Sequence, residues 1–303
     1  MKLGSHVSLG GNDKFLGSIQ EALSYNANCL MVYTGAPQNT SRLPLSKLKI
    51  PEAWALMAIN RIEKTDVFVH APYIVNLANP DIEKQQFAIQ FLTEELIRTT
   101  GLGANVMILH PGNHLNRGCE YGIELIAQGI NQLHRNTQGD STIIAIESMS
   151  GKGTEVGKTF EELQAIIDLI EDKNRIGVCL DSCHLHDAGY DVQTGFSQVI
   201  DEFDRVIGID KLQVFHLNDS KNIRGVAKDR HANIGFGQIG FPAICEILNH
   251  PRISHVAKIL ETPYVSNPAN PKMSYPPYKY EIAMLKAGVF QPDLMDVIVL
   301  AEG

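Results

Sequence analysis

Short apolar runs alternate with longer segments of helical periodicity along the whole chain. Each run is rich in Val, Ile and Leu, and a polar turn follows it before apolar residues begin to recur every three or four positions. The runs come at intervals of roughly 35 residues, the length expected of a βα unit. We take eight of them as strands: Lys2–Ser8, Cys29–Gly35, Asp66–Pro72, Val106–Gly112, Thr142–Ser148, Ile176–Asp181, Leu212–Asn218 and Ala257–Pro263.

The segments between the runs have the period of amphipathic helices. The segment Ile82–Thr100 predicts a helix whose apolar face consists of Phe87, Ile89, Phe91, Leu92, Leu96 and Ile97. The segment Phe160–Leu169 repeats this pattern. Strands and helices in this alternation predict an α/β protein, a (β/α)8 TIM barrel that spans residues 1–303 as a single domain. A doubly wound open sheet is the competing architecture.

Two segments near the C-terminus fit the pattern less well. The stretch Thr262–Tyr280 is rich in Pro, Asn and Lys, and we expect it to form a long loop after the eighth strand. The apolar run Val297–Leu300 either packs under the barrel or marks an interface. No linker or low-complexity tract divides the chain.

The composition is that of an ordinary globular protein. Of the 303 residues, 44% are hydrophobic, and no apolar run approaches the ~20 residues of a membrane-spanning helix. Five cysteines indicate reduced thiols rather than a disulfide framework, so we expect a cytoplasmic protein. The sequence does not fix the oligomeric state, and we take a monomer as the default. The net charge of −8 argues against non-specific coating of nucleic acid, although bound cations would offset part of it.

Histidines and acidic residues stand where the predicted strands end. In a barrel these positions converge on one rim, where active sites of this fold are built. Nine such groups could not be buried together without compensation, and bound cations are the simplest compensation. Histidine with carboxylate suits zinc, manganese or iron. The candidate ligands are His70, His110, Glu147, Asp181, His184, His216, Asp229, His231 and Glu261.

Each of these residues also has a simpler interpretation when taken alone. A single histidine after an apolar strand is more often a hydrogen-bonded core residue than a ligand. Cys179 and Cys183 are a weak sign of zinc, because no second cysteine pair completes a structural site, and we take Cys183 as a packing residue. His114 and His186 are interpreted as outer or exposed residues near the rim.

Five segments of the sequence resemble the endonuclease IV family of apurinic/apyrimidinic (AP) endonucleases. They are His70–Tyr73, Leu109–Gly112, Gly177–His184, His216–Lys221 and Asp229–Gly235, within a similarity that runs from Gly4 to Pro263. The resemblance implies three Zn2+ ions per chain, with Mn2+ or Fe2+ accepted at one position. It implies one ion on His70, His110 and Glu147, a second on Glu147, Asp181, His216 and Glu261, and a third on His184, Asp229 and His231. Residue spacing alone suggests the same partition.

The resemblance further implies a hydrolase of base excision repair that acts on double-stranded DNA containing abasic sites. The expected reaction is hydrolysis of the phosphodiester 5′ to the abasic site, giving a 3′-hydroxyl and a 5′-deoxyribose phosphate. Glu147 and Glu261 are the expected catalytic residues, as ligands that tune the nucleophile and as proton acceptors. An abasic nucleotide has no base to stack, so flipping it into a pocket costs less than flipping a normal one.

Loops on the same rim are expected to contact DNA. Tyr73 and Ile74, just beyond His70, are candidate wedge residues. Gln38 lies in the polar loop after the second strand, where some family members place an arginine; the nearest arginine here is Arg42. Arg230 is a further candidate contact.

Two other functions compete with DNA cleavage. A sugar isomerase or epimerase of the xylose isomerase-like barrel group would need only Glu147, Asp181, His216 and Glu261 around one divalent ion. The remaining five candidate ligands distinguish the two functions, because a one-metal isomerase does not need them. A non-catalytic binder of damaged DNA is the third class, and it would not require a complete ligand set.

Overall fold

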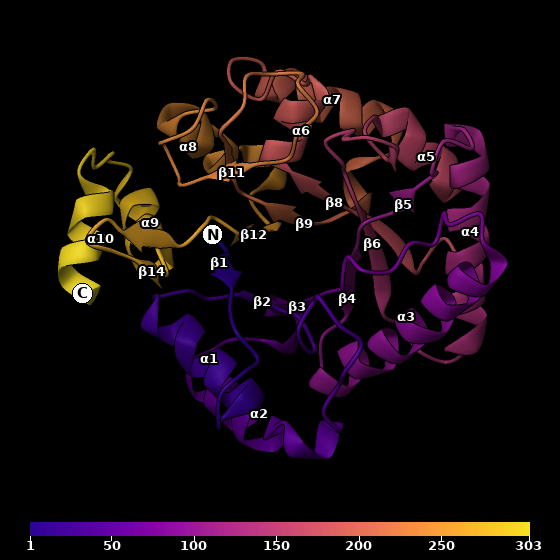
Figure 1. Cartoon of the computed structure of the whole chain (residues 1–303), viewed down its shortest axis with the longest axis horizontal. Coiled ribbons are helices and arrows are strands. Elements are labelled where there is room, and N and C mark those ends of the chain that lie inside the picture. Colours follow the sequence, from indigo (N-terminus) through magenta and orange to yellow (C-terminus); the bar gives the residue numbers. More distant parts are fainter.

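Eight parallel strands close into a barrel in the computed structural model, which describes residues 1–303 (Figure 1). They are β1 Leu3–His6, β2 Leu30–Val32, β3 Val67–His70, β4 Val106–Leu109, β6 Ile143–Glu147, β8 Ile176–Asp181, β9 Leu212–His216 and β12 Ala257–Leu260. Each strand pairs with its neighbours in sequence order, and β1 pairs with β12 to complete the ring. Every strand lies inside its predicted run, so the prediction of a (β/α)8 barrel is confirmed.

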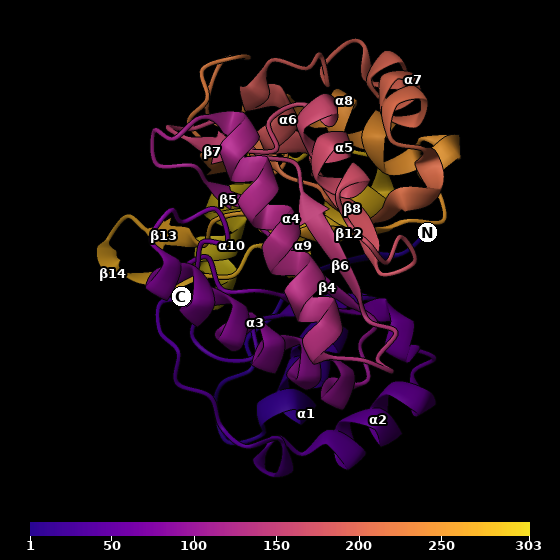
Figure 2. The same cartoon turned by 90° about the vertical axis from the view of Figure 1, so that its right-hand side faces the viewer.

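Helices surround the barrel, and most of them bury an apolar face against it (Figures 1 and 2). They are α1 Lys14–Ser24, α2 Ile50–Ile59, α3 Ile82–Leu102, α4 Cys119–Asn136, α5 Phe160–Asp168, α6 Ser182–Ala188, α7 Phe196–Val206, α8 Phe241–Asn249, α9 Tyr278–Ala287 and α10 Leu294–Glu302. None of them is both long enough and apolar enough to cross a membrane. The large core lies between the helices and the strands. A second, smaller core fills the barrel itself.

The helix α3 differs in detail from its predicted apolar face. Phe87 and Ile97 are about half exposed, whereas Glu95 and Thr99 are fully buried. The buried face is therefore rotated toward these two polar residues. Periodicity could not reveal this rotation, because Glu95 is buried only by virtue of partners elsewhere in the chain, described below.

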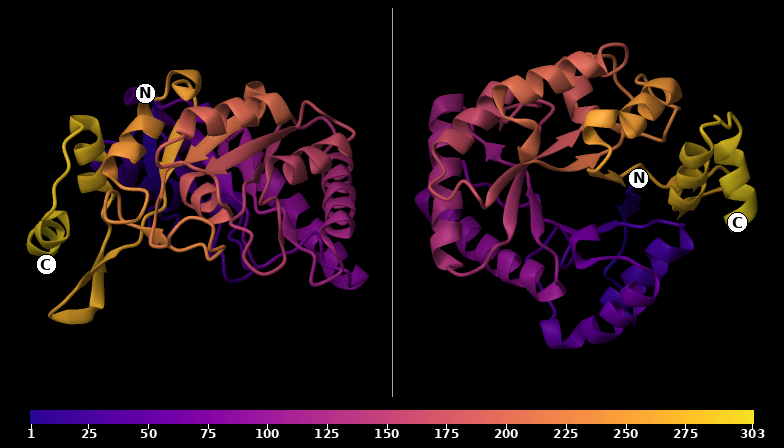
Figure 3. Two further views of the ribbon diagram at one scale, coloured as in Figure 1. Left: turned by 90° about the horizontal axis from the view of Figure 1, so that it is seen from above. Right: turned by 180° about the vertical axis from the view of Figure 1, so that it is seen from behind.

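The expectation of a long loop over Thr262–Tyr280 was wrong. This stretch contains an antiparallel hairpin of β13 Val265–Asn267 and β14 Asn270–Tyr275, and α9 begins at Tyr278. The hairpin projects beyond the body of the barrel (left view of Figure 3). The run Val297–Leu300 belongs to α10, which packs on the hairpin rather than under the barrel. Most of β14 is exposed, so the strand lacks the apolar alternation by which a hairpin is recognised.

Candidate metal centre

Six of the nine candidate ligands extend the interior face of the barrel. Side chains two residues apart in a strand point to the same face. His70 follows the interior residue Phe68 in this way, and Glu147 follows Ala145. The other four pairs are Ile108 with His110, Cys179 with Asp181, Val214 with His216, and Ile259 with Glu261. The apolar interior therefore ends in a layer of imidazoles and carboxylates at the carboxyl ends of the strands.

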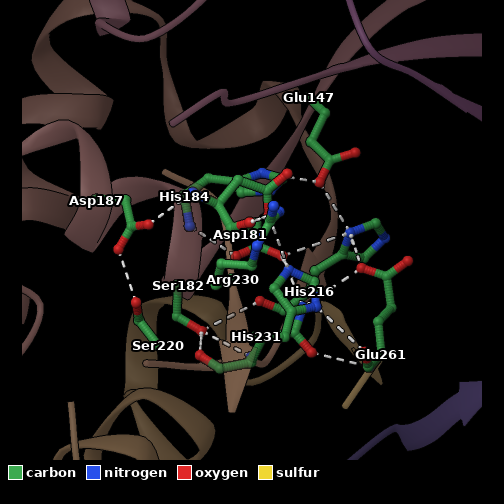
Figure 4. Close-up of polar contacts among 12 residues, drawn as sticks. Glu147, Asp181, Ser182, His184, Asp187, His216, Ser220, Arg230, His231 and Glu261 are labelled. Carbon is green, nitrogen blue, oxygen red and sulfur yellow. Dashed lines mark hydrogen bonds and ion pairs between the residues drawn. The ribbon is translucent and has the colours of Figure 1, made fainter. Parts of the chain in front are cut away.

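Glu147 contacts four histidines of this layer, and Figure 4 shows its side chain directed toward the other labelled residues of the site. One carboxylate oxygen lies 3.2 Å from Nε2 of both His70 and His110. The other lies 3.1 Å from Nδ1 of His216 and 3.2 Å from Nδ1 of His184. The carboxylate is buried, with one oxygen facing His70 and His110 and the other facing His216, so it lies between the first two predicted ligand groups, as a bridge between two ions would.

Asp181 and Glu261 lie near the same ring nitrogen of His216 that Glu147 contacts. Nδ1 of His216 lies 3.0 Å from Glu261 and 3.9 Å from Asp181. Asn218 links the two carboxylates, because its Nδ2 donates to Asp181 at 2.7 Å and to Glu261 at 3.3 Å. Ligand atoms of Glu147, Asp181, His216 and Glu261 all lie within 4.8 Å of one another, and the same is true of His70, His110 and Glu147.

The remaining candidates gather where β8 gives way to α6. Asp181 caps this helix by accepting a hydrogen bond from the backbone N–H of His184 at 2.9 Å, which produces the turn between the two residues. Nε2 of His184 lies 3.2 Å from Asp229, and Nε2 of His231 lies 3.6 Å from the same oxygen. Ligand atoms of Asp181, His184 and His231 also lie within 4.8 Å of one another. Asp181 therefore lies between the second and third predicted groups.

Hydrogen bonds to the backbone fix how three of the histidines present their rings. Nδ1 of His70 donates to the carbonyl of Ala71 at 2.7 Å, that of His184 to Ser148 at 2.9 Å and that of His231 to Glu261 at 3.1 Å. A carbonyl only accepts, so Nδ1 carries a ring hydrogen, which leaves Nε2 as the atom that would bind a metal ion in the neutral ring. Histidines that bind metal ions usually donate their other ring N–H to an acceptor in this way.

The polar atoms of the site are not satisfied by protein groups alone. Nε2 of His231, which faces Asp229 and Asp181, is buried and has no hydrogen-bond partner. A buried polar atom without a partner is costly, and a cation would accept its lone pair. The donor set of five imidazoles and four carboxylates therefore fits divalent metal ions. Burial raises the pKa of the Cys179 and Cys183 thiols, which makes both poor ligands.

The imidazoles and carboxylates of the cluster shift one another's pKa. Burial alone would lower the pKa of His184 and His216, but the carboxylates around them raise the pKa of both rings well above its ordinary value. Burial alone would raise the pKa of Glu147 and Glu261, but His216 and its neighbours hold the pKa of both carboxyls below the usual range. Without metal, protons on the imidazoles therefore compensate the carboxylates.

The candidate DNA-contacting residues have different surroundings. Tyr73 and Ile74 are exposed in the loop after β3. Gln38 is exposed and lines a cavity of about 460 Å³ together with His6, Tyr33 and Tyr264. Arg230 is exposed beside the cluster, and its guanidinium donates to the carbonyl of Asp229.

Arg42 does not face the solvent as a DNA-probing residue would. Its side chain is 7% exposed, and its Nε donates to Glu95 at 2.7 Å. The same guanidinium donates to the carbonyls of Asn39 and Ser41 and lies over the ring of Phe91. Arg42 thus stabilises the loop after β2 by hydrogen bonds to its backbone. This placement gives no support to the expected DNA contact.

Sequence reasoning missed the residues that support the ligands. Asn218, two positions after His216, also accepts from the backbone N–H of Glu261 at 2.8 Å. Asn218 lies two residues beyond His216, so strand periodicity could have predicted that its side chain lies on the same face as the ligand. His186 was expected near the rim; it is buried, and its Nε2 lies 3.1 Å from the carbonyl of Asn222. His114 is half-buried.

Comparison with known proteins identifies the family. Residues 19–287 match the family described as xylose isomerase-like TIM barrel. The chain is 52% identical to the probable endonuclease 4 of Acholeplasma laidlawii, over 96% of this chain and 97% of that protein. The chain belongs to the endonuclease IV family. Endonuclease IV from Thermus thermophilus superposes with a TM-score of 0.80 at 26% identity, over 95% of this chain and 98% of that one.

Sugar epimerases share the fold with this endonuclease IV relative but little of its sequence. A D-tagatose 3-epimerase-like protein superposes with a TM-score of 0.68 at 17% identity, over the full length of both chains. At that identity the likeness extends to the barrel alone. The ligand cluster, rather than the barrel, therefore has to decide between the two functions.

Proposed function

We propose that this endonuclease IV relative hydrolyses the phosphodiester 5′ to an abasic site in duplex DNA, leaving a 3′-hydroxyl and a 5′-deoxyribose phosphate. One observation carries the proposal: nine imidazoles and carboxylates, from six strand ends, the helix α6 and one loop, form a single connected cluster. A one-metal isomerase would use four of them and would leave His70, His110, His184, Asp229 and His231 without a role.

We further propose three zinc ions per chain, with Mn2+ or Fe2+ accepted at one position. The first is assigned to His70, His110 and Glu147, the second to Glu147, Asp181, His216 and Glu261, and the third to His184, Asp229 and His231. Such ions, when bound, stabilise charge on phosphate oxygens and lower the pKa of water. Glu147 is the proposed bridge because one of its oxygens faces His70 and His110 of the first group and the other faces His216 of the second.

The exposure of the ligands indicates from which side the phosphate approaches. Glu147, Asp181 and His216 are buried, whereas the side chains of His110 and Glu261 are 30% and 17% exposed. Glu261 is therefore the carboxylate of the bridged group that a water molecule reaches, and we assign it the role of proton acceptor. Asn218 keeps this carboxylate oriented by its contacts to both the side chain and the backbone of Glu261. Glu147 shares the catalytic role by orienting the histidines around it.

The duplex is proposed to lie across the rim, with the abasic nucleotide flipped toward the cluster. Tyr73 and Ile74 are placed to enter the gap that the nucleotide leaves, since both are exposed directly beyond His70. Gln38 and Arg230 are proposed contacts to the DNA backbone. We propose that the protein works as a monomer in the cytoplasm.

Product analysis separates this function from that of a sugar epimerase. A duplex with one abasic site, labelled at both ends, should be cut once on its 5′ side and yield a 3′ end that a DNA polymerase extends. D-Tagatose and D-fructose should remain unchanged under the same conditions. Epimerisation of either sugar with one equivalent of Mn2+ per chain, and no cleavage of the duplex, would overturn the proposal.

A further inference from the structure

The loop 221–230, between the short strands β10 Asp219–Ser220 and β11 His231–Ala232, carries the candidate ligand Asp229 near its end. Ala227 and Asp229 both adopt left-handed backbone conformations, with φ of 53° and 54°. Residues other than glycine occupy this region at a cost. Contacts outside the loop must therefore hold it in this conformation.

Asp187, on the helix α6, supplies most of these contacts. Its carboxylate accepts a hydrogen bond from Ser220 Oγ at 2.7 Å (Figure 4). It also accepts from Asn222 Nδ2 and from the backbone N–H of Asp229, both at 2.8 Å. Its backbone carbonyl accepts from the N–H of Ala227 at 2.9 Å. The side chain is completely buried and forms no ion pair. A single carboxylate thus joins the first residues of the loop to the residue that bears the ligand.

The same helix carries a second candidate ligand of the same group. His184 lies three residues before Asp187, in the first turn of α6, and its Nε2 is 3.2 Å from the carboxylate of Asp229. The helix therefore fixes one ligand directly and the backbone of the other through Asp187. Neighbouring carbonyls add to this: His186 accepts from the N–H of Gly225 at 3.0 Å.

We propose that Asp187 is a positioning residue for the metal group of His184, Asp229 and His231. Its hydrogen bond to the N–H of Asp229 sets the direction of that carboxylate toward the two imidazoles. The inference rests on one part of the proposed function, namely that His184, Asp229 and His231 together hold a metal ion. Loss of an outer partner of a metal ligand weakens metal binding by about 10–100-fold. Removing Asp187 should therefore release the ion of this group and leave the ions on Glu147 in place.

The loop offers a matched control at Asp191. This exposed carboxylate forms an ion pair with Arg224 at 2.9 Å and therefore anchors the same loop at a point remote from Asp229. Asp187→Asn is the conservative variant, because its amide oxygen accepts from Asp229 while its NH2 donates to Ser220 Oγ. Asp187→Ser replaces Asp187→Ala if the alanine variant does not fold.

The test is the zinc retained per chain by each purified full-length variant after dialysis against a competing chelator of graded strength. We expect Asp187→Ala to lose one equivalent at a chelator strength at least about tenfold lower than the wild type requires. Asp187→Asn and Asp191→Asn should keep it. Cobalt substitution should show the loss as a change in the visible spectrum of one site only.

Three results would overturn the proposal: full retention by Asp187→Ala, equal loss from Asp191→Asn, or simultaneous loss of all ions with a lower melting temperature of the metal-free variant. Equal loss from Asp191→Asn would mean that Asp187 only anchors the loop. Loss of all ions with a lower melting temperature would mean that Asp187 stabilises the whole fold. None of these readouts involves DNA, so failure of the wild type to cut an abasic duplex would be a separate result against the proposed function alone.

Discussion

The chemistry of the site depends on individual strand-end residues, and most of these were evident from the sequence. An apolar strand that ends in His or Glu places that side chain on the interior face if it lies two residues beyond an interior position. His70, Glu147 and His216 satisfy this rule, so their convergence followed from strand periodicity. Asn218 and Asp187 did not stand out, because their roles depend on hydrogen bonds between elements distant in sequence.

Replacement of Glu261 by glutamine should abolish most of the activity and leave the fold intact. The amide has nearly the same shape but accepts no proton and is a weaker ligand. We expect the rate of cleavage of an abasic duplex to fall by about 10²–10⁴-fold. The measurement is single-turnover cleavage, with circular dichroism as the control for folding. Unchanged cleavage would exclude the proposed role of Glu261 and favour a protein that only binds damaged DNA.

The stability of the metal-free protein should fall as the pH rises. The carboxylates raise the pKa of His184 and His216 in the folded chain, so these imidazoles contribute stability that is complete below the unfolded pKa of about 6.5 and is lost as the pH passes the folded pKa. Urea unfolding of chelator-treated protein at several pH values above 6.5 measures this trend.

Metal-loaded protein provides the internal comparison for this pH series. Metal displaces the ring protons, so its stabilising effect at constant free zinc should increase with pH over the same range. The stability of the metal-loaded protein should therefore change little over the range in which that of the metal-free protein falls. Parallel slopes would mean that these imidazoles do not hold the metal.

At the scale of elements, the rim loops were harder to predict than the strands. The hairpin β13–β14 was missed because most of β14 is exposed and its segment contains Pro and Asn. The interior face of α3 was misplaced because Glu95 is buried as the partner of Arg42 and Thr34. Both errors arise where tertiary contacts, rather than periodicity, decide which residues are covered.

Arg42→Ala should destabilise the protein rather than weaken DNA binding directly. The substitution leaves the fully buried Glu95 without its cation and frees the loop after β2. Breaking a buried ion pair in this way costs about 3–5 kcal/mol. Denaturant unfolding measures the loss, and Arg42→Lys, which keeps the charge but not the planar fork, should show a smaller one. Unchanged stability together with weaker binding of abasic duplex would restore Arg42 as a DNA contact.

Tyr73→Ala should weaken the binding of abasic duplex without lowering stability. Tyr73 is 53% exposed, so little packing is lost, whereas an aromatic stacked on a base contributes about 1–3 kcal/mol to binding. We expect the dissociation constant to rise about tenfold in an equilibrium binding assay. Phe87→Ala is the matched control, since Phe87 is 51% exposed on the outer helix α3. Equal effects of the two substitutions would remove Tyr73 from the proposed interface.

At the scale of the whole molecule, the barrel followed from the sequence because eight apolar runs recur at the spacing of βα units. The closed ring of parallel strands brings residues from His70 to Glu261 to one rim, although they are far apart along the chain. The fold alone does not decide the function, since epimerases share it. The proposal therefore depends on the five candidate ligands outside the four-ligand isomerase set.

The central claim is that metal ions held by this cluster cut DNA at abasic sites. The most direct measurement is cleavage of a duplex that carries one tetrahydrofuran analogue of an abasic site, by the purified protein before chelation, after chelation and after zinc is restored. We predict a single cut 5′ to the analogue, its loss on chelation and its return with zinc. Cleavage of the unmodified duplex at a similar rate, or cleavage that survives complete removal of metal, would contradict the claim.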